Sequence, residues 1–130
     1  TMKRHKLSSR MSVEGNWSAQ SGYEGLHTLI KAGAKFTGLV VANDQMALGA
    51  IAALNELGLR VPEDVSVVGF DDIPESGYFL PALTTVHQDF MALGQQCVEY
   101  LVSLITNPDT PVHQRVLYPK LVVRSSTAPH

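Results

Sequence analysis

Apolar residues along most of the chain fall alternately into short β-branched runs and into stripes at helical spacing. A β-branched run bounded by turn formers is typical of a buried parallel strand, and an apolar residue at every third or fourth position indicates an amphipathic helix. Ser18 is placed to cap the first helix, and Gly33 and Gly58 are placed to end the first and second helices. The expected helices cover residues 19–32, 44–57 and 89–105, and the expected strands cover residues 39–42, 65–68, 84–86 and 116–123.

Two of the expected strands end in polar residues just before the chain turns. Asn43 and Asp44 follow the first strand. Asp71 and Asp72 follow the second. Parallel strands joined by a helix form a right-handed βαβ unit, so both polar ends are expected at one sheet edge, where ligands of open α/β folds bind, and Asp71 becomes a candidate site residue. The alternative for Asn43 or Asp44 is a cap on the next helix, although the carboxamide of Asn43 also suits a ligand rich in hydroxyl groups.

The segment between the second and third strands has an unusual composition for a turn. Residues 73–84 contain two prolines, a glycine and several large apolar residues. A loop of this length and apolarity is expected to pack against its own core or against a partner.

The composition fits one globular domain and indicates in which cellular compartment and with which partners it is expected. The chain has 130 residues, of which 45% are hydrophobic and 17% charged, and it contains no apolar run of membrane-spanning length. Its net charge of −2 does not suggest a nucleic-acid surface, and a solvated end explains the basic residues at positions 3–10. No apolar stretch of a secretory signal follows them, and the single Cys97 fits a reducing compartment. We therefore expect a cytoplasmic protein with no membrane partner.

The sequence contains none of the common catalytic motifs. It lacks a GxSxG elbow, a Walker loop, a GxGxxG turn and an HExxH pair, and its five histidines are scattered. Cys97 lies on the apolar stripe of the third helix and is expected to be a core residue. We expect no enzyme, catalytic residue, metal or cofactor. The open alternative is a flavodoxin-like phosphoacceptor or enzyme in which Asp71 and Asp72 hold a hard cation.

A longer pattern is carried by four segments, GNWSAQSGYEGL, LVVANDQMALGAI, GLRVPEDVSVVGFDDIPESGYFLPALTTVHQDFMALGQQ and LVVRSST. Between about residues 14 and 126 they resemble the effector-binding domain of LacI/GalR-type bacterial transcription repressors. The resemblance implies an α/β, periplasmic-binding-protein-like fold of type I, with a mostly parallel sheet flanked by helices. Residues 14–130 would form mainly the C-terminal lobe of a sugar-binding domain, after a poorly matched segment at residues 1–13. The chain would be a C-terminal piece, and the helix at residues 89–105 would belong to the other lobe.

The same resemblance implies a binding site for a small sugar effector, with a galactoside as the expected class. Trp17 and Phe90 would offer apolar faces to the sugar ring. Asn43, Asp71 and Gln88 would form hydrogen bonds to its hydroxyl groups.

The resemblance also implies partners. Leu48 and Phe79 match positions that face a second subunit, so a homodimer is expected. Operator DNA would be bound only through a helix-turn-helix headpiece lying before residue 1. A periplasmic sugar receptor shares the fold and stays open as an alternative that would require export.

Overall fold

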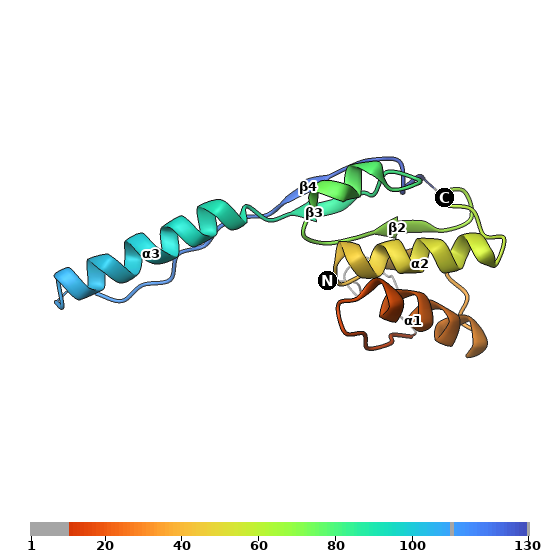
Figure 1. Cartoon of the computed structure of the whole chain (residues 1–130), viewed down its shortest axis with the longest axis horizontal. Coiled ribbons are helices and arrows are strands. Elements are labelled where there is room, and N and C mark those ends of the chain that lie inside the picture. The colour runs from red at the N-terminus through yellow and green to blue at the C-terminus, as the bar shows by residue number, and fades with distance from the viewer. Residues whose placement is uncertain (1–10, 110, 130) are drawn as a thin grey trace.

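The computed structural model describes residues 11–109 and 111–129 and has two parts, an α/β body and a helix that projects from it (Figure 1). In the body, β1 (Gly38–Val40) and β2 (Ser66–Val68) pair in parallel, with Leu39 opposite Val67. The helices α1 (Ala19–Lys31) and α2 (Asp44–Glu56) precede and connect these strands. The predicted βαβ unit is therefore confirmed.

Local capping rules account for where the two body helices begin and end. The side chain of Ser18 accepts a hydrogen bond from the amide of Ser21, and the side chain of Asn43 accepts one from the amide of Met46. Gly33 and Gly58 follow the helix ends with φ angles of 78° and 74°, a left-handed conformation that glycine adopts without steric penalty.

The two body helices pack closely because a glycine lies at their contact. A Cβ atom at Gly49 of α2 would overlap the backbone oxygen of Ala19 at the start of α1. This approach buries the apolar face of α2 against α1 and the sheet, and burial of each large aliphatic side chain contributes about 1.5–3 kcal/mol. The core contains Leu26, Val41, Met46, Ala47, Ala50, Ile51, Ala53, Leu54, Val61, Val65, Val67, Phe79 and Leu83.

A second strand pair leads away from the body. Here β3 (Thr85–His87) pairs antiparallel with β4 (Lys120–Val122). Single parallel bridges from Val68 to Thr84 and from Asp71 to His87 join the end of β2 to β3. The mixed but chiefly parallel arrangement agrees with the periplasmic-binding-protein-like fold of type I expected from the resemblance.

The apolar loop after β2 packs on the body, as its composition predicted. It forms a short 3-10 helix, η2 (Pro74–Tyr78), in which Ser76 is fully buried. Phe79 and Leu83 belong to the core, whereas Tyr78 and Leu80 are exposed.

The projecting helix α3 (Phe90–Thr106) has no buried residue. The interpretation of Cys97 as a core residue is therefore wrong for this chain, because nothing in the described structure covers the stripe on which it lies. The last strand is also much shorter than predicted, since residues 111–119 have no regular secondary structure. Apolar residues in that segment fit a strand pattern, but no neighbouring strand among the described residues pairs with them there. Among the described residues, no helix combines the length and apolarity needed to cross a membrane.

Candidate functional site

Asp71 lies directly beyond β2 in a backbone conformation that is rare for a residue with a side chain. Its φ angle is 108°, and that of Asp72 is 56°. The Asp71 amide donates to the carbonyl oxygen of Val86 at 2.9 Å. Gln88 Nε2 donates to Asp71 Oδ1, also at 2.9 Å, so these two candidate residues are in direct contact. The other carboxylate oxygen of Asp71 accepts no hydrogen bond from the described residues and remains able to bind a ligand.

Asp72 turns inward and forms the charged centre of the site. Arg124 Nη2 donates to Asp72 Oδ1 at 2.7 Å, Ser76 Oγ donates to the same oxygen at 3.1 Å, and His87 Nδ1 donates to Oδ2 at 3.0 Å. Burial raises the pKa of Asp72, but the hydrogen bonds from Arg124 and Ser76, the Arg124 charge and the His87 bond outweigh it and lower the pKa below its usual value. Asp72 therefore stays ionised. Sequence reasoning missed Arg124, because 52 residues separate it from its partner and no local pattern marks it.

Asp44 is fully buried and is not a helix cap, which corrects the interpretation of it as a cap. Its Oδ1 accepts a hydrogen bond from Thr85 Oγ1 at 2.6 Å, and its Oδ2 accepts one from the Ile73 amide at 2.9 Å. The cap is Asn43, one residue earlier. Both residue types cap helices well, so only the tertiary partners distinguish them. Asp44 fixes the loop after β2 to the beginning of β3.

Asn43 uses its whole carboxamide inside the protein. Its Oδ1 accepts from the Met46 amide at 2.9 Å, while Nδ2 donates to the backbone oxygen of Trp17 at 3.0 Å and to Gln45 Oε1 at 2.9 Å. Asn43 is 5% exposed, whereas Trp17 is 71% exposed and has a φ angle of 64°. Asn43 therefore holds the segment that presents the indole ring, in addition to capping α2.

The candidate residues form two joined pairs, Asp71 with Gln88 and Asn43 with Trp17. Phe90 lies two residues after Gln88, at the beginning of α3, and is exposed. Beside it, a cavity of about 290 Å³ opens between residues 87–93 and residues 117–120. Asp71, Gln88 and Phe90 thus lie where the body meets the projecting helix, whereas no printed contact joins the Asn43–Trp17 pair to them among the described residues.

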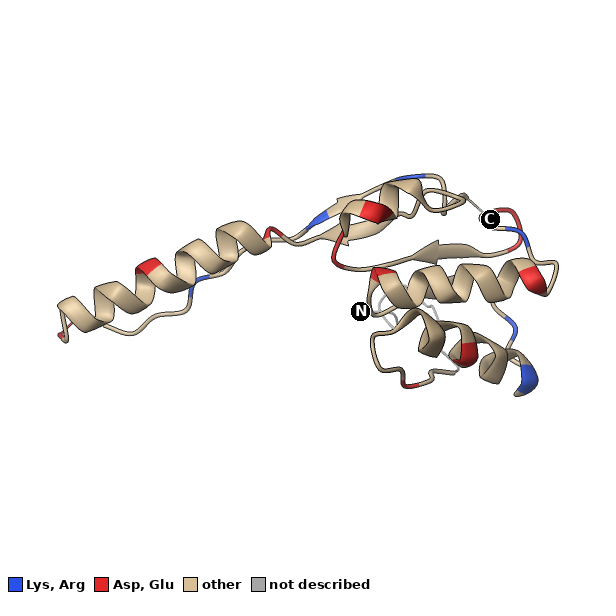
Figure 2. Cartoon of the chain, viewed as in Figure 1, with Lys and Arg blue, Asp and Glu red and all other residues tan. Residues whose placement is uncertain are grey.

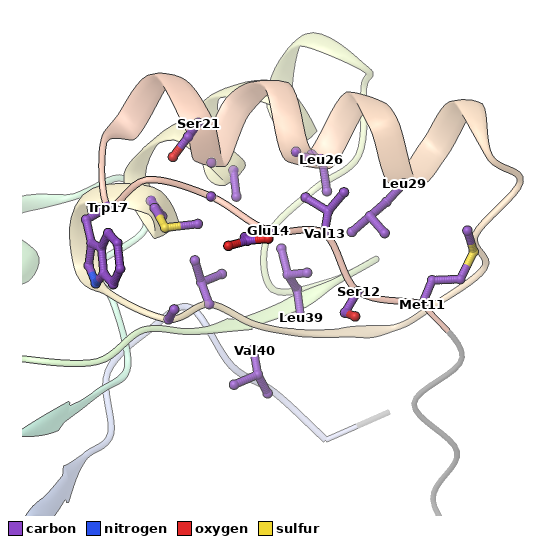
Figure 3. Close-up of a pocket in the computed structure, with 17 residues that line it drawn as sticks. Met11, Ser12, Val13, Glu14, Trp17, Ser21, Leu26, Leu29, Leu39 and Val40 are labelled. Carbon is purple, nitrogen blue, oxygen red and sulfur yellow. The ribbon is translucent and has the colours of Figure 1, made fainter.

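Another cavity, of about 390 Å³, lies beside β1 and α1 (Figure 3). Residues 11–15 form one side and β1 the other, and Trp17 lies at one end. Its walls are mainly apolar, as Val13, Leu26 and Val40 illustrate. Trp17 is the one candidate effector residue that lines this cavity; Asn43, Asp71, Gln88 and Phe90 do not line it.

The two expected interface residues differ in accessibility. Leu48 is 43% exposed on α2, but Phe79 is 8% exposed and packs in the core. Its neighbours Tyr78 and Leu80 carry the exposed apolar surface of that loop.

Charged groups are sparse on the projecting helix, where Glu99 is the one charged residue between Phe90 and Thr106 (Figure 2). In the part of the chain that the structure describes, no group of three or more histidine, cysteine, aspartate or glutamate residues is arranged to hold a metal ion.

The parallel strands deliver polar side chains to one edge of the sheet, and β3 and β4 lead from that edge to α3 and back. This arrangement is typical of a periplasmic-binding-protein-like domain. A family model described as a periplasmic binding protein-like domain matches residues 1–127. The chain therefore belongs to this family of periplasmic binding protein-like domains, and it matches the effector-binding part of LacI-family repressors.

Named relatives support this assignment. The chain is 45% identical over 117 residues to the HTH-type transcriptional repressor PurR of Haemophilus influenzae strain PittEE, covering 88% of this chain and 35% of that protein. It is 46% identical over 103 residues to the lactose operon repressor of Escherichia coli K12, covering 79% and 29% respectively. The crystal structure of the Lac repressor dimer bound to operator and the anti-inducer ONPF superposes with a TM-score of 0.91 at 42% identity, covering 97% of this chain and 44% of that one. The chain thus spans about a third of the length of these relatives.

Proposed function

We propose that this chain is the part of a bacterial transcription repressor that binds a small carbohydrate effector, with a galactoside as the expected class. The observation that carries the proposal is the joined pair of Asp71 and Gln88 at the end of β2. The pair offers a carboxylate oxygen that accepts hydroxyl protons, next to an amide that both donates and accepts. A sugar hydroxyl group can both donate and accept a hydrogen bond, so it can bind each of these two groups.

Aromatic surface near the pair supports a ring-shaped ligand. Trp17 is anchored through its backbone to Asn43 and leaves its indole exposed. Phe90 exposes its ring at the beginning of α3. The C–H faces of a sugar ring pack well on such rings, and two faces would contribute apolar contact that the polar pair lacks.

In the whole protein, effector binding would alter the operator affinity of a separate DNA-binding region. Effector and operator affect each other only if both bind unequally to the two states of the protein. A homodimer through the Leu48 side of α2 and the loop around Phe79 is part of the proposal. Exposed Leu48, Tyr78 and Leu80 support it.

The proposal is tested by isothermal calorimetry on the full-length protein that contains this chain, with isopropyl β-D-thiogalactoside and a panel of monosaccharides and disaccharides. Replacement Asp71→Asn removes a charge-assisted bond, worth roughly 1.5–3 kcal/mol, and should weaken sugar binding by at least about tenfold. Asparagine tolerates a positive φ angle, so the backbone need not change. The matched control is Asp64→Asn, because Asp64 pairs with Arg60 near the other end of β2. Equal sugar affinity in Asp71→Asn and wild type, or no binding by any sugar of the panel, would contradict the proposal.

A further inference from the structure

Two consecutive side chains after β2 bind two consecutive side chains at the end of β3. Gln88 Nε2 donates to Asp71 Oδ1, and His87 Nδ1 donates to Asp72 Oδ2. Between them, the amide of Asp71 donates to the backbone oxygen of Val86. The ligand-facing pair is therefore one of two adjacent links, and the second link faces inward.

The inward link also reaches the chain as it returns from α3. Arg124, two residues after β4, donates from Nη2 to Asp72 Oδ1 at 2.7 Å. Its Nη1 donates to the backbone oxygen of Leu83 at 2.8 Å and to Ser76 Oγ at 3.1 Å. Asp72 is thus bonded to both segments that connect the body to α3, the outgoing one through His87 and the returning one through Arg124.

We propose that Asp72 is a positioning residue of the effector site, which fixes the Asp71–Gln88 pair by tying its turn to the outgoing and returning segments of α3. The identity of the ligand in this inference rests on the proposed function, whereas the positioning of Asp71 and Gln88 by Asp72 does not. Asp72 touches no ligand in this role. Asp72 directly follows Asp71, and its partner His87 directly precedes Gln88. The bond between Asp72 and His87 therefore holds the two members of the ligand-facing pair next to each other.

The backbone conformation explains why such a tie is needed. Asp71 and Asp72 both have positive φ angles, which residues with side chains rarely adopt. A turn of this kind persists only where the surrounding structure holds it in place. The side chain of Asp72 is 14% exposed, so its ion pair with Arg124 is largely shielded from water and holds the turn more firmly than a surface pair would.

The side chains that bind Asp72 from the segments leading to and from α3 belong to two places in the fold. His87 lies on β3 and Arg124 lies just beyond β4. Lys120 of β4 is the backbone partner of His87 and adds a further positive residue at this junction. Replacement of Asp72 by a neutral residue would leave the guanidinium of Arg124 without its carboxylate partner.

The test uses amide hydrogen exchange, resolved residue by residue, on the full-length protein that contains this chain, in the absence of any ligand. In Asp72→Asn, the protection factor of the Asp71 amide should fall at least about tenfold relative to wild type. The Val67 amide, which donates to the backbone oxygen of Ser126 in the core, should keep its protection. A purely structural role would lower both protection factors together. Equal protection of Asp71 in variant and wild type, or an equal fall at both amides, would overturn the proposal.

Two variants complete the experiment. Asp64→Asn breaks an ion pair with Arg60 away from the site and should change neither amide. If Asp72→Asn does not fold, His87→Ala replaces it, because the His87 side chain is 44% exposed and its loss is tolerable. It should lower the Asp71 protection factor at least about threefold, and no change would overturn the proposal. Since no sugar is used, failure here is distinct from failure of the carbohydrate panel.

Discussion

The carboxylate of Asp44 occupies the space in which a side chain at residue 69 would stand. A Cβ atom added to Gly69 would lie closer to Asp44 Oδ1 than van der Waals contact allows, and 2.8 Å from Leu83 Cδ2. Asp44 cannot move aside, because Thr85 and the Ile73 amide hold its two oxygens. The last turn before Asp71 is therefore shaped by a buried carboxyl group on α2.

Replacement Gly69→Ala should destabilise the protein by about 1–3 kcal/mol, the usual range for overpacking a filled interior. Urea unfolding followed by circular dichroism measures the change. The matched control is Gly38→Ala on β1, where an added Cβ has no neighbour within 4 Å. A loss at residue 69 no larger than that at residue 38 would contradict the prediction.

Thr85→Val should also destabilise the protein, because it removes the hydroxyl that donates to Asp44 Oδ1 at 2.6 Å. The shape is conserved, so the effect isolates the hydrogen bond. A buried acceptor left without its donor costs about 1–3 kcal/mol. Thr37→Val, at an exposed position, serves as the control and should change the free energy of unfolding little. Equal urea midpoints for the two variants would count against the importance of this bond.

Acidification should remove part of the stability through Asp72. Its pKa is lowered in the folded state, since hydrogen bonds from Arg124 and Ser76 outweigh the effect of burial, so folding is favoured most when the group is ionised. The contribution is present above the unfolded value of about 3.8 and is lost as the pH falls through the lowered folded value. Urea midpoints between pH 6 and pH 3 should fall less steeply in Asp72→Asn than in wild type. Parallel pH profiles would show that the group does not contribute.

The chain should associate with itself at micromolar concentration, because the apolar side chains of α3 are open to solvent. A continuous exposed apolar face along a whole helix is uncommon on monomers and tends to bind another apolar surface. The double variant Leu101→Lys with Ile105→Lys should shift the sedimentation coefficient toward the monomer, whereas Gln95→Lys on the same helix should not. A wild-type monomer at tens of micromolar would refute the prediction. The exposed residues of this surface are Phe90, Met91, Leu93, Val98, Leu101, Val102 and Ile105.

The elements governed by short-range rules were predictable from the sequence. The cap at Ser18 and the parallel pairing of β1 with β2 depend on residues within one turn or one βαβ unit. The same reasoning located Asp71 beyond the second strand, because the apolar run ends at a recognisable position. Spacing along the chain could not predict its contact with Gln88, because the two residues follow different strands.

The predictions that were wrong concern residues whose burial or pairing depends on segments distant in the sequence. Residues 116–123 carry a strand-like pattern, but only Lys120–Val122 pairs with a neighbour. Cys97 lies on an apolar stripe that no described segment covers, so periodicity alone gave the wrong burial. Asp44 was indistinguishable from a cap until its partners Thr85 and Ile73 were located in space. Sequence patterns identify apolar faces, whereas tertiary contacts decide what covers them.

The attachment of α3 by two adjacent connectors gives it the geometry of a lever. A helix of 17 residues is about 25 Å long, so a rotation of about 10° at its base would displace its far end by roughly 4 Å. The fulcrum is the place where His87 and Arg124 share the carboxylate of Asp72. An adjustment too small to disturb the packing of the body would therefore become, at the far end of α3, a movement comparable to the width of a side chain.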